Sequence, residues 1–132
     1  MQRKLKMKII NNDSYEEMAA AFQCYQIQAL YEVLKENNIS KEQTTKICEE
    51  FTHSFGAGLD QHWIETEEGK VFPEIAFTKK HLDYNPDELY INNGAFSFSE
   101  YSSGDISWFF EENDPDTKPQ VYGTVNENGE PA

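Results

Sequence analysis

This sequence of 132 residues has little positive charge: it contains 11 Lys and Arg against 24 Asp and Glu, a formal net charge of −13. Four of the cations lie within the first eight residues, and one of them, Arg3, is the only arginine. Residues 9–132 therefore carry seven cations and 24 anions, a net charge of −17. Proteins bind nucleic acids and nucleotides mainly through cationic contacts to phosphate, so we expect residues 9–132 to bind neither well. The charge favours a basic protein partner, and the alternative is an acidic surface that only maintains solubility.

Long apolar runs and cysteine motifs are also missing. No segment approaches the roughly eighteen apolar residues needed to cross a bilayer, and no apolar signal core follows the basic start. Cys24 and Cys48 fit neither a zinc spacing nor a Cys-x-x-Cys motif. We predict a cytosolic protein of one domain, residues 1–132, with a basic leader at residues 1–8 and a mobile tail at residues 126–132.

Two amphipathic helices are predicted in the first half of the chain. Residues 14–37 place apolar side chains at three- and four-residue spacing behind a capping box that starts at Ser14. A second capping box, starting at Ser40, opens a helix that we expect Gly56 and Gly58 to end. The short link predicts an antiparallel hairpin. In that hairpin the two cysteines are too far apart for a disulfide, so we expect buried thiols.

Beyond residue 61 the pattern changes from helical to alternating, which is typical of strands. The strongest hairpin signal is Asn93-Gly94, which suits a type I′ turn. We therefore predict an α+β fold in which the helical hairpin packs on one face of an antiparallel β-sheet of about five to six strands. The expected strands are residues 61–67, 70–77, 89–92, 95–101, 106–111 and 121–125.

Catalytic chemistry has few candidates in this sequence. His53, Asp60 and His62 are close enough to suggest a metal-dependent hydrolase, but their spacing matches no recurring zinc motif. His81 precedes Asp83 by two residues, which places the two side chains on opposite faces unless the loop is tight. We predict no catalytic residue, no metal site and no cofactor, with the hydrolase as an alternative.

Tyrosines and carboxylates crowd the C-terminal half and are the candidate binding residues. Tyrosine rings anchor a protein partner, while carboxylates steer it and pair with its lysines and arginines. A divalent cation is a weaker alternative because the carboxylates lack a calcium-loop spacing, and a polar outer sheet face is the plain one. The predicted binding residues are Asp83, Tyr84, Asp87, Glu88, Tyr90, Glu100, Tyr101, Asp105, Glu111, Glu112, Asp114 and Asp116.

Charge and size together favour a small, acidic, non-catalytic inhibitor. By analogy we expect a bacterial immunity protein that neutralises a basic, nuclease-type toxin by presenting carboxylates where phosphates would bind. Such a protein would be a monomer or weak dimer when free and would bind neither nucleic acid nor membrane directly. The alternatives are a nucleic-acid mimic that inhibits a host defence enzyme, the metal-dependent hydrolase, and an assembly protein that uses an apolar helix face.

Overall fold

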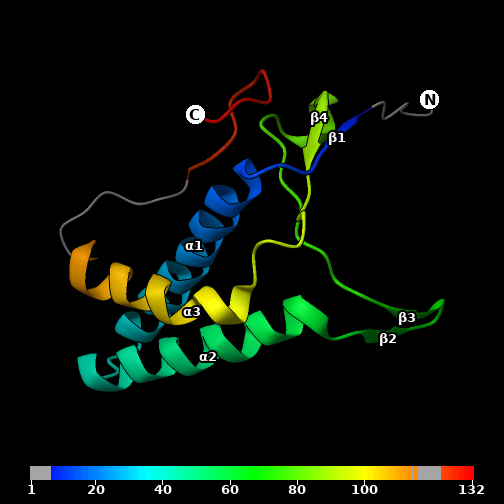
Figure 1. Ribbon diagram of the computed structural model, residues 1–132. Coiled ribbons are helices and arrows are strands. Elements are labelled where there is room, and N and C mark those ends of the chain that lie inside the picture. Colours follow the sequence, from blue (N-terminus) through cyan, green and yellow to red (C-terminus); the bar gives the residue numbers. More distant parts are fainter. Residues whose placement is uncertain (1–6, 114, 116–122) are drawn as a thin grey trace.

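Three helices form the main body of the protein in the computed structural model, which describes residues 7–113, 115 and 123–132. Each helix contacts the other two, and Figure 1 shows α2 and α3 running side by side with α1 behind them. None of the helices in the described ranges has both the length and the apolar character that a bilayer crossing requires. The helices are α1 (Ser14–Glu36), α2 (Lys41–Gln61) and α3 (Phe98–Ser107), and the π-helical turn η2 (Trp108–Glu112) continues α3.

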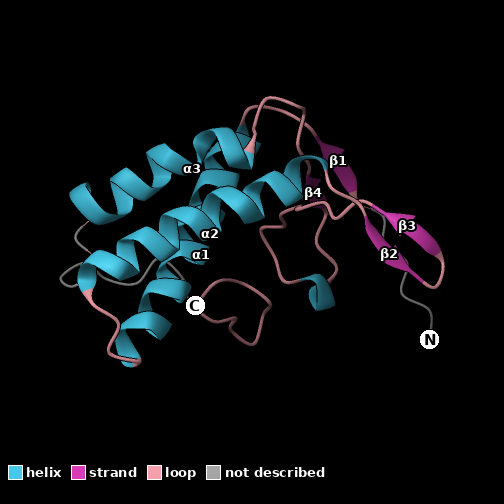
Figure 2. Ribbon diagram, turned by 90° about the horizontal axis from the view of Figure 1, so that it is seen from below, coloured by secondary structure: helices cyan, strands magenta, loops and turns pink. Residues whose placement is uncertain are grey.

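Two small sheets lie beside the helices. β1 (Lys8–Ile10) pairs in parallel with β4 (Glu88–Tyr90), and β2 (Ile64–Thr66) pairs antiparallel with β3 (Gly69–Val71). A 3₁₀ helix, η1 (Leu82–Tyr84), precedes β4. In Figure 1 and Figure 2 the β2–β3 hairpin extends from the end of α2 and away from the helices.

The predicted antiparallel sheet of five to six strands is wrong, because the described residues contain four strands in two separate sheets. The main error concerns residues 95–101 and 106–111, most of which belong to α3 and η2. Gly94 does turn the chain, with a φ of 93°, but the turn leads into a helix and not into a second strand. The apolar residues of this segment fit a helix as well as a strand, once the buried Ser102 is counted as part of the buried face.

The helical hairpin of α1 and α2 agrees with the sequence pattern, although one cap differs. Ser40 Oγ accepts a hydrogen bond from Gln43 N at 3.2 Å, as its capping box predicts. Ser14 is not a cap: it is the first helical residue, and Asn12 Oδ1 accepts a hydrogen bond from its backbone N–H at 3.0 Å. The prediction of two buried, free cysteines is confirmed.

The expected end of α2 at Gly56 and Gly58 is wrong, because the helix runs on to Gln61. Gly56 is buried where α2 crosses the start of α3. A Cβ at this position would lie 2.9 Å from the carbonyl carbon of Phe98 and 2.9 Å from the amide nitrogen of Ser99. Gly56 therefore serves the close approach of two backbones and does not end the helix.

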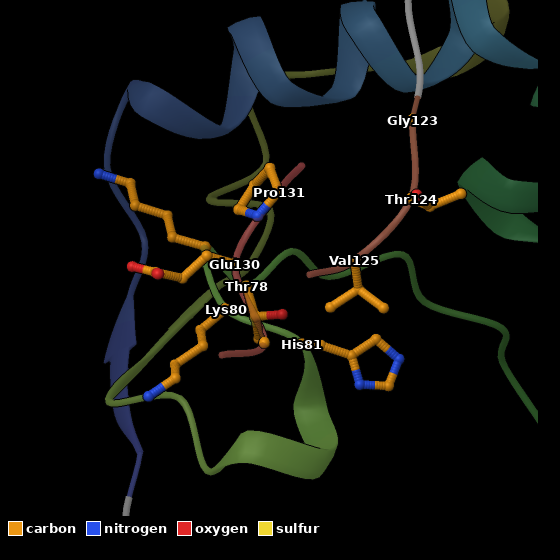
Figure 3. A pocket seen from close by; sticks show the side chains of 10 residues that line it. Thr78, Lys80, His81, Gly123, Thr124, Val125, Glu130 and Pro131 are labelled. Carbon is orange, nitrogen blue, oxygen red and sulfur yellow. The ribbon is translucent and has the colours of Figure 1, made fainter. Parts of the chain in front are cut away.

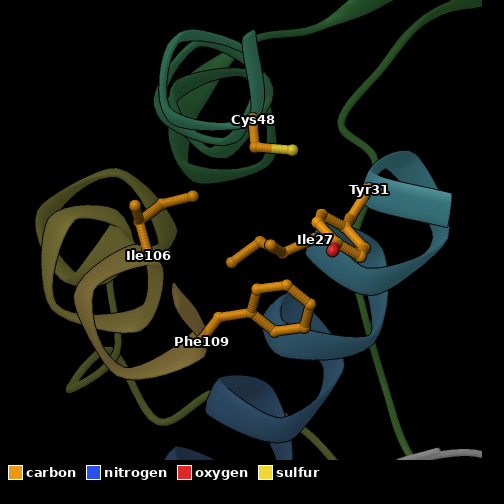
Figure 4. Packing of buried hydrophobic residues seen from close by; sticks show 5 residues of the cluster. All are labelled: Ile27, Tyr31, Cys48, Ile106 and Phe109. Carbon is orange, nitrogen blue, oxygen red and sulfur yellow. The ribbon is translucent and has the colours of Figure 1, made fainter. Parts of the chain in front are cut away.

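The core consists of two clusters of buried side chains along the helices. One cluster lies between α1 and the segment that starts α3, where the Tyr15 hydroxyl donates a hydrogen bond to Ile75 O at 2.6 Å. The other joins all three helices and η2, and Figure 4 shows its side chains converging from the three sides. This second cluster consists of Ile27, Tyr31, Cys48, Ile106 and Phe109.

The C-terminal segment, for which the sequence suggested mobility, makes backbone hydrogen bonds. Asn126 N donates to Glu130 O at 2.8 Å, and Ala132 N donates to Thr124 O at 2.9 Å. The loop also reaches the body of the protein, because His81 N donates to the carbonyl oxygen of Gly129 at 2.7 Å. The mobility of residues 126–132 stays a prediction.

The close approach at Gly56 predicts a large difference between two neighbouring glycines of α2. Gly56→Ala should lower the free energy of unfolding by about 1–3 kcal/mol, because its methyl group would overlap the α3 backbone. Gly58→Ala is the matched control: its nearest atom, His62 Nδ1, would lie 3.7 Å away, so the change should be neutral or stabilising by up to about 1 kcal/mol. Urea denaturation followed by circular dichroism measures both, and equal effects would contradict the packing described.

Candidate functional site

A carboxylate from α2 holds the first turn of α3. Asp60 Oδ1 accepts a hydrogen bond from Phe98 N at 2.7 Å. Asp60 Oδ2 accepts three more, from Ser99 N at 3.0 Å, Ser99 Oγ at 2.6 Å and Ser97 Oγ at 2.8 Å. Ser97 Oγ also accepts a hydrogen bond from Glu100 N at 3.3 Å and is the N-cap of α3. The N–H groups of Phe98, Ser99 and Glu100 have no carbonyl partner within the helix, and they are bonded instead to Asp60 and Ser97.

Asp60 is a structural anion in this arrangement. Its partial burial alone would raise the pKa of the carboxyl, but the hydrogen bonds from Ser99, Ser97 and Phe98 hold that pKa below its ordinary value of 3.8. The positive end of the α3 helix dipole also favours the charged form. The carboxylate is therefore ionised at neutral pH and joins α2 to α3.

The three residues considered for a metal-dependent hydrolase do not come together. His53 Nδ1 lies 3.4 Å from Ser102 Oγ, Asp60 is bound to the start of α3, and His62 lies beside an apolar groove. Within the part of the chain that the structure describes, no group of three or more His, Cys, Asp or Glu side chains could hold a metal ion.

His81 and Asp83 lie on the same side of a tight turn. His81 is the N-cap of η1, its Nδ1 accepts a hydrogen bond from Asp83 N at 3.2 Å, and the same nitrogen lies 3.6 Å from Asp83 Oδ2. The exception stated for a tight loop therefore applies, because the segment is a 3₁₀ turn and is not extended.

The predicted binding residues do not share one face. Because the expected sheet is absent from the described residues, they divide into a group on or beside η1 and β4 and a group on α3 and η2, which lie apart in Figure 1. The first group is Asp83, Tyr84, Asp87, Glu88 and Tyr90; the second is Glu100, Tyr101, Asp105, Glu111 and Glu112; Asp114 and Asp116 lie outside the described residues.

The first group is partly used within the protein itself. Tyr90 is only 5% exposed, and its hydroxyl donates a hydrogen bond to Glu88 Oε1 at 3.2 Å. The Lys79 ammonium lies 5.3 Å from the centre of the Tyr90 ring. The ring of Tyr84 lies against the backbone of Gly129 in the C-terminal loop. Tyr84, Glu88 and Tyr90 therefore make contacts within the protein, which leaves less of their surface for a partner.

A pocket of about 320 Å³ lies between residues 78–81 and the C-terminal loop (Figure 3). Lys80 and His81 line it from one segment, and Glu130 lines it from the other. Charges of both signs meet here, so this pocket lacks the uniformly acidic character expected of a site for a basic partner.

The second group, without Asp105 and together with Trp108, forms a strip of acidic and aromatic side chains, which we call the α3 strip. Residues 98–113 contain four carboxylates and no Lys, Arg or His. Tyr101 and Trp108 are 45% and 39% exposed, and their spacing of seven residues places them two turns apart on the same side. Tyr101 stacks on Phe96 with ring centres 4.7 Å apart. The α3 strip consists of Glu100, Tyr101, Trp108, Glu111 and Glu112.

Trp108 is the member of the strip that the sequence pattern did not suggest. As part of a strand it would share a face with Ile106, but in the helix Ile106 is buried and Trp108 is exposed. The signal that indicates this is the spacing of the buried Phe98, Ser102 and Ile106, four residues apart each time.

Comparisons with protein-family models, curated proteins and solved structures find no match, so the function has to be argued from this geometry.

Asp105 does not belong to the strip. It is partly buried, and its Oδ2 has no hydrogen-bond partner among the described residues. Burial raises the pKa of Asp105 to about 6, because a charged carboxylate loses its hydration there. Burial raises the pKa of the Cys24 thiol to about 12, and the negative charge of Asp105 is a second, smaller cause. Cys24 is therefore an unreactive thiol.

Asp60 predicts an acid-dependent loss of stability. Because the folded pKa lies below the unfolded value of 3.8, the contribution of Asp60 is present above that value and is lost as the pH falls through the folded pKa. Asp60→Asn should cost roughly 2–3 kcal/mol at pH 7 and should flatten the acid limb of the stability curve. Asp13→Asn is the control, because Asp13 precedes α1 without a side-chain cap bond. Urea denaturation across the pH range measures both; an acid limb that Asp60→Asn leaves unchanged would refute the role.

Asp105 predicts the opposite sign. Its folded pKa of about 6 lies above the ordinary value of 3.8, so its charge destabilises the fold increasingly between these pH values and fully above them. Asp105→Asn should raise the free energy of unfolding by roughly 1–3 kcal/mol at pH 7, with the gain vanishing below about pH 4. Asp87→Asn, at an exposed position, should change little. A gain that persists at low pH would show that the charge is not the cause.

Proposed function

We propose that this protein is a small, acidic, non-catalytic binding protein that inhibits a basic protein target, in the manner of an immunity protein that neutralises a nuclease-type toxin. The observation that carries this proposal is the α3 strip, where exposed Tyr101 and Trp108 lie among carboxylates with no cation in residues 98–113. Trp and Tyr side chains often supply most of the binding energy of a protein interface, and carboxylates beside them can pair with the lysines and arginines of a basic partner.

The strip is also rigid, which favours binding. Asp60 holds its first turn, Tyr101 is stacked on Phe96, and Phe109 is fully buried on the opposite side of the helical segment. Glu111 accepts a hydrogen bond from Ser107 Oγ at 2.8 Å, which limits its rotamers. A face that is ordered before binding loses little conformational entropy when a partner docks.

The net charge of −17 over residues 9–132 adds long-range attraction. It raises the association rate with a basic target and makes that rate sensitive to salt. The carboxylates of the strip are grouped at its two ends around the aromatic rings, an arrangement that favours a protein target over the mimicry of a nucleic-acid duplex. In this proposal the protein acts in the cytosol, is a monomer or weak dimer when free, and needs no cofactor.

The proposal predicts that charge reversal on the strip weakens binding much more than the same reversal elsewhere. Once a basic target has been identified by capture at low salt, Glu111→Lys with Glu112→Lys should weaken its affinity about tenfold to hundredfold in calorimetry. The wild-type affinity should fall as salt is raised, and inhibition of the target's activity should fall with the affinity.

Glu36→Lys with Glu127→Lys is the matched control, since it makes the same change in net charge at two exposed positions outside the strip. It should reduce the affinity much less. Equal losses for both pairs would mean that net charge, and not the strip, carries binding. A target bound without salt dependence would also refute the proposal.

A further inference from the structure

A second surface, distinct from the α3 strip, lies between α2 and the β2–β3 hairpin. It is an apolar groove of about 550 Å³, which we call the hairpin groove. Phe51 and Phe55 line it from α2, and Trp63, Ile64 and Pro73 line it from the hairpin side. The four large side chains are between 43% and 52% exposed. Contiguous apolar exposure of this kind is typical of an interaction site and not of an ordinary surface.

The walls of the groove are ordered by contacts within the chain. The Phe51 and Phe55 rings stack with their centres 5.5 Å apart and their planes 9° apart. The Lys70 ammonium lies 4.3 Å from the centre of the Trp63 ring. The groove therefore presents aromatic surfaces in a defined arrangement, one of which already accepts a cation on its face.

The hairpin would gain from being covered. Ile64 and Val71 are paired across the two strands, and both are more than 40% exposed. An isolated pair of three-residue strands is marginal in water, because neither face is packed on a core. A ligand in the groove would bury one of these apolar faces and stabilise the hairpin.

The two segments that line the groove, the second half of α2 and the hairpin with its flanks, are acidic in sequence. Residues 49–74 contain seven carboxylates and one lysine, Lys70, which lies over Trp63. Asp60 is bound to α3, which leaves six carboxylates. An anionic lipid surface or a nucleic acid would be repelled, and so would a second copy of a chain with this net charge. The six carboxylates are Glu49, Glu50, Glu65, Glu67, Glu68 and Glu74.

We propose that the hairpin groove binds a segment of a partner protein in which apolar or aromatic side chains are flanked by lysine or arginine. The apolar side chains fill the space between Phe55 and Trp63, and the cations pair with carboxylates that α2 and the hairpin carry beside their lining residues in the sequence. This inference goes beyond the proposed function, because the groove shares no residue with the α3 strip and is tested with other variants.

A synthetic peptide that alternates Lys with Phe and Leu is the probe, with a second peptide in which Glu replaces every Lys. Amide chemical shifts of the full chain should change within residues 49–74 on addition of the Lys peptide and should hardly change with the Glu peptide. Phe51→Ala with Phe55→Ala should weaken the Lys peptide about tenfold or more. Val33→Ala with Leu82→Ala, which also truncates two exposed apolar side chains, should leave its affinity unchanged.

Charge reversal on the hairpin gives an independent variant that leaves the apolar residues intact. Glu65→Lys with Glu67→Lys should weaken the Lys peptide and strengthen the Glu peptide. Equal affinities of wild type for the two peptides, or shift changes confined to other residues, would overturn the proposal. So would association with neutral-lipid vesicles in place of the peptide, or a self-association that Phe51→Ala with Phe55→Ala abolishes, since either would assign the groove to another occupant.

Discussion

The bond between the Asp60 carboxylate and the first turn of α3 is the interaction on which the rest of the arrangement depends. It ties the end of α2 to residues 97–99, which lie almost forty positions further along the chain. Gly56, one turn earlier in α2, lets the two backbones touch, and the fully buried Gln23 of α1 donates a hydrogen bond to Phe98 O at 3.0 Å. Because α1 and α2 both hold the start of α3, the direction of the third helix is set at this one point.

Setting α3 in this direction separates a buried face from a charged one. Ile106 and Phe109 enter the core shared by all three helices, while Tyr101 and Trp108 stay outside. The carboxylates of this segment lie on its outer side, except for Asp105, which is partly buried and whose pKa is raised by that burial. The acidic composition therefore becomes a local strip only through the packing of the helix that carries it.

Both helices of the hairpin could be predicted from the sequence, because their apolar residues repeat every three or four positions over more than twenty residues. The segment that forms α3 could not, because Phe96, Phe98, Ile106 and Phe110 also satisfy a strand alternation over a short stretch. The deciding residue is Ser102, which is buried on the helical face although its polarity hides it from a hydrophobic pattern. The predicted binding residues fall into two separate groups for the same reason: they were expected on one sheet, and half of those described lie instead on α3 and η2.

What the sequence by itself determined is the negative charge, which follows from composition, and the two long helices, which follow from a local period; the free thiols then follow from the spacing of the cysteines in the helical hairpin. Only the tertiary structure decided that residues 98–107 are helical, because Asp60 from a distant helix accepts the Phe98 and Ser99 N–H groups beside the local cap, Ser97. It also decided that Gly56 lies at a helix contact and does not end α2, and that Phe51, Phe55 and Trp63 remain about half exposed. A local pattern reports which side chains are apolar, but whether they are covered depends on which other elements pack against them.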